Sequence, residues 1–89
     1  MKIKASSFST PNPKNPDYSL EEVEFYGVII GNGHRLSLRK NLKTDRYEIY
    51  KTFIFENRNE VVYTYSTLSD AVRTANRITK EVSRHILVY

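Results

Sequence analysis

The stretch HRLSLRKNLKTDRYEIYKTFIF, residues 34–55, decides the fold, because it holds two strand patterns joined by a turn. In residues 34–40, Leu36 and Leu38 alternate with polar side chains, as in a β-strand with one apolar face. Residues 46–55 are rich in aromatic and β-branched side chains, which favour strands. The polar segment between them indicates a turn, so the stretch predicts an antiparallel hairpin.

The second strand of this hairpin also alternates, with one charged exception. One face carries Tyr47, Ile49, Phe53 and Phe55, with Lys51 among them, and the other carries Arg46, Glu48, Tyr50, Thr52 and Ile54. Neighbouring strands place opposite charges side by side on such a face. We therefore expect a cross-strand pair between Arg39 and Glu48.

Two further strands flank the hairpin. A strand from about Phe25 to Ile30 precedes it, and Asn32-Gly33 predicts a type I′ turn because both residues tolerate positive φ. After the turn ENRNE, VVYTY at residues 61–65 predicts a fourth strand. Upstream, Ser19 and Glu22 match a capping box. The strand-like residues that follow leave room for at most one helical turn there.

A helix is predicted to follow the last strand. Thr67 is placed to cap it, and Asp70 suits the positive end of the helix dipole. At 100° per residue, one apolar face contains Leu68, Ala71, Ala75, Ile78, Val82 and Ile86. The expected fold is α+β, an antiparallel β-meander of three to four strands with one C-terminal amphipathic helix packed on one face.

Proline divides the chain into two parts. All three prolines lie in residues 5–19, where each removes an amide donor and disfavours helix in the preceding residue. We predict a flexible Pro/Ser/Asn-rich N-terminal arm over residues 1–20, with MKIK as an alternative edge strand, and a single α+β domain over residues 21–89. Deleting residues 2–16 is then expected to leave the stability nearly unchanged.

The charge is distributed unevenly along the chain. Of the net charge of +4, residues 1–30 carry −1 and residues 31–89 carry +5. A basic half suggests DNA, RNA or an acidic protein as partner, although many small domains carry such charge for solubility alone. The 89 residues lack cysteine and any apolar run of membrane-spanning length. We expect no membrane partner and a cytoplasmic location.

No catalytic signature is present. The histidines, His34 and His85, fall at a turn and near a helix end, and no nucleotide-binding, zinc-protease or hydrolase motif occurs. Glu21, Glu22 and Glu24 could bind a divalent ion, but carboxylates adjacent in one local segment are usually only solvated. We therefore expect no enzyme activity, no catalytic residue, no metal site and no cofactor.

Four basic residues form the first candidate site. Arg73, Arg77, Lys80 and Arg84 fall on the helix face opposite the apolar stripe, within about 60° of arc. Such a face is able to contact several phosphates. The alternative is an ordinary solvated helix back, with Glu81 pairing with Arg77 and Arg84.

The outer face of the sheet is the second candidate. It is expected to carry Arg35, Arg39, Arg46 and Tyr50, with Tyr26 beside them and with Lys40 and Lys43 at the turn. Arginines among tyrosines contact phosphates and stack on bases. The alternative is a solvated face with arginine–glutamate pairs.

Exposed apolar residues favour a different function, a protein–protein interaction or homodimerisation module without a nucleic-acid role. The apolar ending HILVY and the residues Val28, Ile30, Ile54 and Val62, expected on the outer face, would be buried by a second copy. We nevertheless favour a small basic non-enzymatic domain that binds nucleic acid through the helix.

Overall fold

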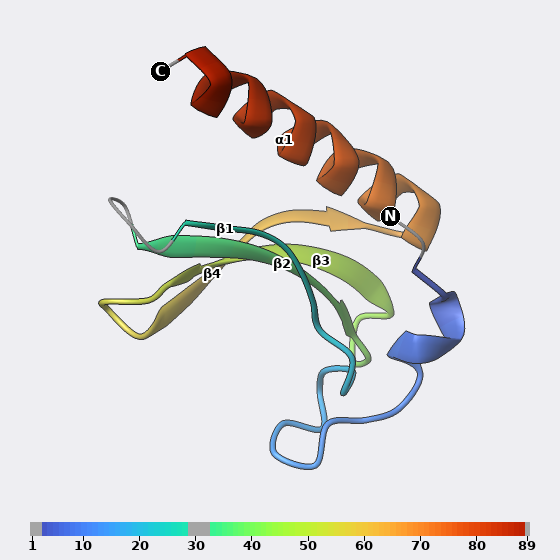
Figure 1. The fold of residues 1–89 in the computed structure, drawn as a ribbon. Helices are drawn as coiled ribbons and strands as arrows, with labels where there is room; N and C mark the ends of the chain where they lie inside the picture. Colours follow the sequence, from blue (N-terminus) through green and yellow to red (C-terminus); the bar gives the residue numbers. More distant parts are fainter. Residues whose placement is uncertain (1–2, 29–32, 89) are drawn as a thin grey trace.

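A four-stranded antiparallel sheet and one long helix make up the fold (Figure 1). The computed structural model describes residues 3–28 and 33–88, with side chains described for residues 3–27 and 33–81. The elements are the 3₁₀ helix η1 (Ala5–Phe8), the strands β1 (Val23–Val28), β2 (His34–Asn41), β3 (Arg46–Phe53) and β4 (Arg58–Tyr65), and the helix α1 (Leu68–Val88). The strands follow one another in the order β1-β2-β3-β4, and α1 crosses one face. The predicted α+β meander is confirmed.

The turns between strands use the residues that tolerate positive φ. Asp45 has a φ of 58° before β3, and Asn57 has a φ of 49° before β4. The Asn41 side-chain oxygen accepts hydrogen bonds from the amides of Lys43 and Thr44, which fixes the β2–β3 turn. Before β2, Gly33 has a φ of 56°. The other half of the predicted turn, Asn32, and the predicted strand residue Ile30 lie outside the described residues.

The core lies between α1 and the sheet. Leu38, Ile49, Ala71 and Ala75 are fully buried, as predicted for the strands and the helix. The predicted place of Phe55 on the same face is wrong, because β3 ends at Phe53 and Phe55 is 78% exposed in the following turn. The two small alanines let the helix backbone approach the sheet closely. Thr67 caps α1, since its hydroxyl accepts a hydrogen bond from the Asp70 amide. The predicted core residues Val82 and Ile86 have no described side chains.

Bulges interrupt the register of both edge strands. In β1, Glu24 pairs with Ser37 and Tyr26 pairs with Leu36, so Phe25 is an extra residue. Tyr26 consequently lies on the face that Leu36 shares with the core, and its expected place on the outer face is wrong. A second bulge lies in β4: Ile49 pairs with Tyr63 and Tyr50 pairs with Val61, so Val62 is an extra residue.

The segment before β1 is packed against the sheet at two points. Phe8, in η1, is fully buried and meets the Tyr47 ring edge-on at 5.8 Å. Ser19 is also fully buried; its hydroxyl accepts a hydrogen bond from the Lys40 amide and donates one to the Glu21 carbonyl. The described residues around Ser19 form no helical turn. The flexibility of residues 1–20 stays a prediction, but Phe8 is a core residue.

Candidate nucleic-acid interface

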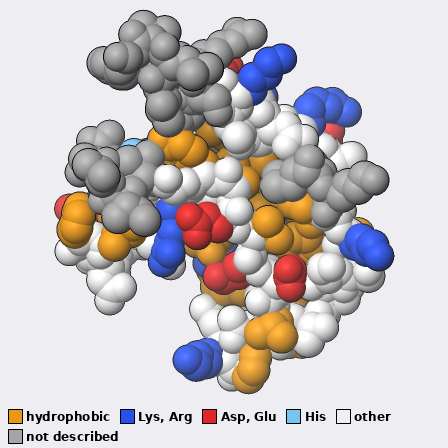
Figure 2. All heavy atoms as spheres, in the orientation of Figure 1, with side chains coloured by type: hydrophobic (Ala, Val, Ile, Leu, Met, Phe, Trp, Pro, Cys, Tyr) orange, Lys and Arg blue, Asp and Glu red, His pale blue; other side chains and the backbone are white. Residues whose placement is uncertain are grey.

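The basic residues of α1 lie on the side of the helix away from the sheet. Arg73, Arg77 and Lys80 are exposed, and Lys and Arg side chains project from the upper side of α1 in Figure 2. From Arg73 to Lys80 the helix rises about 10 Å at 1.5 Å per residue. These three residues are called the helix stripe below. The side chain of the fourth predicted member, Arg84, lies outside the described part of the chain.

The helix stripe has few charge partners. Arg73 lies 3.7 Å from the Asp70 carboxylate, but its side chain is 80% exposed, so solvent weakens the pair. Within the described side chains, Arg77 and Lys80 form no ion pair, and the pairing of Arg77 with Glu81 that the alternative interpretation included is not formed. Thr74, between Arg73 and Arg77 in sequence, is buried and donates a hydrogen bond to the Tyr65 hydroxyl.

On the opposite face of the sheet, Arg39 is enclosed. Its Nε donates a hydrogen bond to a Glu48 oxygen at 3.0 Å, which confirms the expected cross-strand pair. The guanidinium also lies 3.7 Å from the centre of the Tyr18 ring and 4.3 Å from that of Tyr50. With only 8% of the residue exposed, Arg39 is not accessible to a phosphate.

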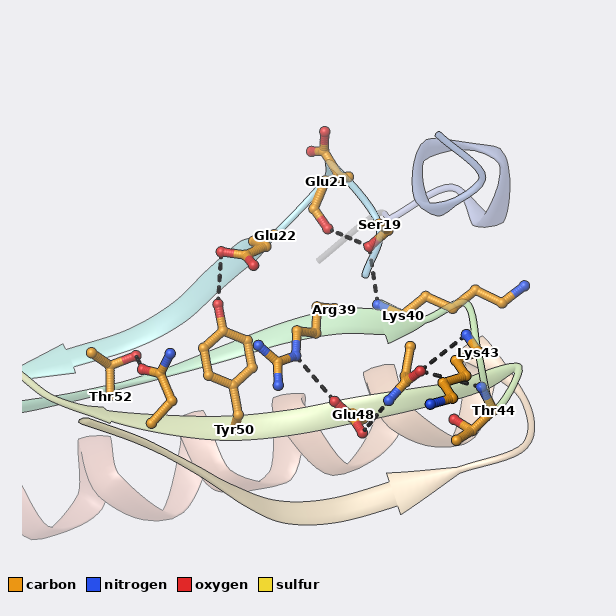
Figure 3. Close-up of polar contacts among 12 residues, drawn as sticks. Ser19, Glu21, Glu22, Arg39, Lys40, Lys43, Thr44, Glu48, Tyr50 and Thr52 are labelled. Carbon is orange, nitrogen blue, oxygen red and sulfur yellow. Dashed lines mark hydrogen bonds and ion pairs between the residues drawn. The ribbon is translucent and has the colours of Figure 1, made fainter. Parts of the chain in front are cut away.

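Tyr50 is likewise a structural residue in this arrangement. It is 4% exposed, and its hydroxyl donates a hydrogen bond to the Glu22 carboxylate at 2.9 Å (Figure 3). Burial, reinforced by Glu22, raises the pKa of Tyr50 to about 12. The ring therefore has no free face on which a base could stack, and its hydroxyl is protonated at neutral pH.

The remaining basic residues of the second candidate surface are exposed to different degrees, and most of them already have partners. Arg35 lies 3.8 Å from Glu24, and Arg46 donates hydrogen bonds to the backbone oxygen and the hydroxyl of Thr64. Lys40 does not belong to this face: it is opposite Tyr47 of the core, with its Nζ 5.2 Å from the ring centre, and it pairs with Asp45 at 3.0 Å, a hydrogen bond that raises the lysine pKa. Lys43 is exposed and forms no ion pair with a described side chain. The structure thus distinguishes the two predicted surfaces. The basic side chains of the helix stripe are exposed with few charge partners, whereas most of those on the outer face are buried or bound to other groups of the protein.

A groove that the sequence did not indicate adjoins the helix stripe. It has a volume of about 660 Å³ and is lined by residues of the N-terminal segment and of the first turns of α1. Its lining includes Ile3, Lys4, Leu68, Val72, Arg73 and Asn76. The sequence signal for this groove is weak, because Ile3 and Lys4 are separated from α1 by more than sixty residues and their contact has no local pattern.

A second concavity lies on the outer face. It has a volume of about 390 Å³ and its lining is mostly polar, with Glu22, Glu24 and Arg35 on one side and Asn57 and Asn59 on the other. Its internal contacts include the ion pair of Arg35 with Glu24 and the hydrogen bond from Thr52 to Asn59. Its polar groups are thus largely paired with one another.

Apolar side chains are exposed along β4 and at the preceding turn. Val61, Val62 and Tyr63 are each about two-fifths exposed on this edge strand, and Phe55 is 78% exposed. Ile54, which the sequence placed on the outer face with Val62, is also exposed. The side chains of Val28 and Ile30 are outside the described set.

The described residues contain neither a metal-binding cluster nor a membrane-spanning helix. Within residues 3–28 and 33–88, no three His, Asp or Glu side chains are placed to hold a metal ion. No helix in this part of the chain is long and apolar enough to cross a membrane. Comparison with known protein families, curated proteins and solved structures finds no significant match.

Proposed function

We propose that this chain is a small non-enzymatic domain that binds nucleic acid through the helix stripe. One observation supports this proposal above the others: Arg77 and Lys80 are both exposed, one turn apart on α1, without an ion-pair partner among the described side chains. A polyanion is the partner that such a surface attracts, because phosphates bound by Lys and Arg release counterions. The net charge of +4 adds a long-range attraction.

The contacts of the basic residues on the outer face of the sheet also favour α1 as the phosphate-binding surface. Arg39 and Tyr50 are buried, and releasing Arg39 would break a buried ion pair. Arg35, on the same face, already has an acidic partner in Glu24. Phosphate binding on the outer face would therefore compete with contacts inside the protein, whereas on α1 it would compete only with the exposed Arg73–Asp70 pair among the described side chains.

The proposal is tested by the fluorescence anisotropy of labelled DNA and RNA oligonucleotides at low salt. The double variant Arg77→Gln/Lys80→Gln is expected to weaken binding on the order of tenfold, since two phosphate contacts are lost. Lys14→Gln/Lys43→Gln is the matched control, because both lysines are exposed and lie away from α1. Equal loss in the two variants would show that only net charge matters, and no binding by the wild type would refute the proposal.

The exposed apolar side chains of β4 favour a second candidate, homodimerisation. An edge strand offers unpaired backbone groups to a further strand, and Val61, Val62 and Tyr63 add apolar area to it. This candidate is compatible with the first, because β4 and the solvent side of α1 are different surfaces (Figure 1).

A further inference from the structure

The groove beside the helix stripe is continuous with it through one residue. Arg73 belongs to the stripe and also lines the groove, and Asn76 lies one turn further along the same helix. A chain of phosphates along Arg73, Arg77 and Lys80 would therefore pass the mouth of the groove. The groove is accordingly able to receive a group attached to that phosphate chain.

The lining of the groove has two chemical parts. Ile3, Leu68 and Val72 provide apolar walls, and each is only partly buried. Lys4 and Arg73 add positive charge from the N-terminal segment and from α1. An apolar cavity with a few polar groups suits a flat, largely apolar ligand, and the two cations suit one that carries negative charge.

We propose that this groove holds an unstacked base of a single-stranded nucleic acid. The inference rests on the proposed function and specifies its ligand class. A base whose backbone phosphates lie on the helix stripe would match both parts of the lining. Its apolar face would contact Val72, and its adjoining phosphate would contact Lys4 and Arg73. Asn76 carries an amide that is able to pair with the edge of a base.

A duplex is excluded from this arrangement. Its bases are paired and stacked, so inserting one would require breaking those contacts, which single strands do not have. The protein should therefore bind a single strand more tightly than the same sequence in duplex form. The groove offers aliphatic side chains rather than aromatic rings, so the preference should be weaker than that of proteins that stack bases on aromatic platforms.

The test compares three labelled probes of equal length at one salt concentration: an oligothymidine, a duplex, and an abasic deoxyribose-phosphate strand. Val72→Thr keeps the shape of the side chain but makes the wall polar. It should weaken oligothymidine binding about fourfold, the equivalent of about one buried methyl group, and should leave the duplex and the abasic strand unaffected. Val61→Thr is the matched control, since Val61 is an exposed valine on β4.

The outcomes separate the inference from the proposed function. If Val72→Thr weakens all three probes equally, or none, the groove does not hold a base, while the proposed function stands as long as Arg77→Gln/Lys80→Gln still weakens binding. If no probe binds the wild type, both fail. Equal affinity of the wild type for oligothymidine and for the abasic strand would also overturn the inference, because phosphates alone would then account for binding.

Discussion

Arg39 and Glu48 form a buried ion pair on the face of the sheet opposite the helix, with 3.0 Å between the Nε and carboxylate oxygen atoms. The Asn41 amide donates a further hydrogen bond to the same carboxylate. The rings of Tyr18 and Tyr50 lie beside the guanidinium, so the segment before β1 is held on the sheet by a charged side chain. This pair is a structural element, and its disruption should affect folding rather than binding.

Glu48→Leu should lower the free energy of unfolding by about 3 kcal/mol, because it leaves the Arg39 charge buried and unpaired. The double variant Arg39→Leu/Glu48→Leu should be more stable than the single variant, since no charge remains in the site. Urea denaturation monitored by circular dichroism measures both. A loss below about 1 kcal/mol for Glu48→Leu is what a solvated surface pair would give.

Phe8 provides a test of the N-terminal segment. Phe8→Ala should cost about 3 kcal/mol of stability, because it removes a fully buried ring that packs against Tyr47. Leu20→Ala is the control, since Leu20 is in the same segment but more than half exposed. Deleting residues 2–16 removes Phe8 and should likewise lower the melting temperature, contrary to the expectation from proline content. An unchanged transition would mean that Phe8 does not contribute to the core in solution.

The ionisation of Tyr50 makes the free energy of unfolding depend on pH in the alkaline range. Its pKa rises from 10.0 in the unfolded chain to about 12 in the fold, so the folded state retains the proton more tightly. The stabilisation is complete below pH 10 and is lost as the pH rises toward 12, an effect of the order of 2 kcal/mol. The phenylalanine variant has no hydroxyl to ionise, so the stability of the wild type relative to Tyr50→Phe should fall between pH 10 and 12.

The control for this measurement is Tyr63→Phe, which changes an exposed tyrosine on β4. Its stability relative to the wild type should stay constant over the same pH range. If the two phenylalanine variants give parallel curves, the Tyr50 hydroxyl does not hold its proton through burial and the Glu22 contact.

Homodimerisation is tested by sedimentation at micromolar concentration, where a dimer has twice the monomer mass of 10.4 kDa. Ile54→Lys/Val62→Lys should shift the protein to monomer without lowering its melting temperature, since both side chains are exposed within one copy. Leu20→Lys, at another exposed apolar residue, should leave the mass unchanged. A wild-type protein that sediments as a monomer would contradict this candidate.

The parts of the fold that follow from local periodicity could be predicted from the sequence. Alternation located β2 and β3, the 3.6-residue period located the buried face of α1, and Asp45 and Asn57 lie in predicted turns. Each of these features depends on residues close together in the sequence, so it can be recognised from a single segment of the chain.

Features that depend on distant contacts could not be predicted in this way. Phe8 is a single aromatic residue in a proline-rich segment, and only the approach of Tyr47 makes it a core residue. The bulge at Phe25 moves Tyr26 to the other face, a shift that alternation alone does not show. Arg39 looked like a surface arginine because the Tyr18 ring that covers it comes from a segment without strand or helix periodicity.

The salt dependence of binding separates the helix stripe from a general charge effect. With three phosphate contacts from Arg73, Arg77 and Lys80, the slope of log K against log salt should be about −2.7 for a duplex and about −2.1 for a single strand, from about −0.9 and −0.7 per contact. Arg77→Gln/Lys80→Gln removes two contacts and should reduce the duplex slope to about −0.9. Lys14→Gln/Lys43→Gln lowers the net charge by the same amount and should leave the slope unchanged, because neither lysine lies on α1. If the control variant flattens the slope equally, the phosphates are not held on the helix, and binding reflects the total charge of the domain.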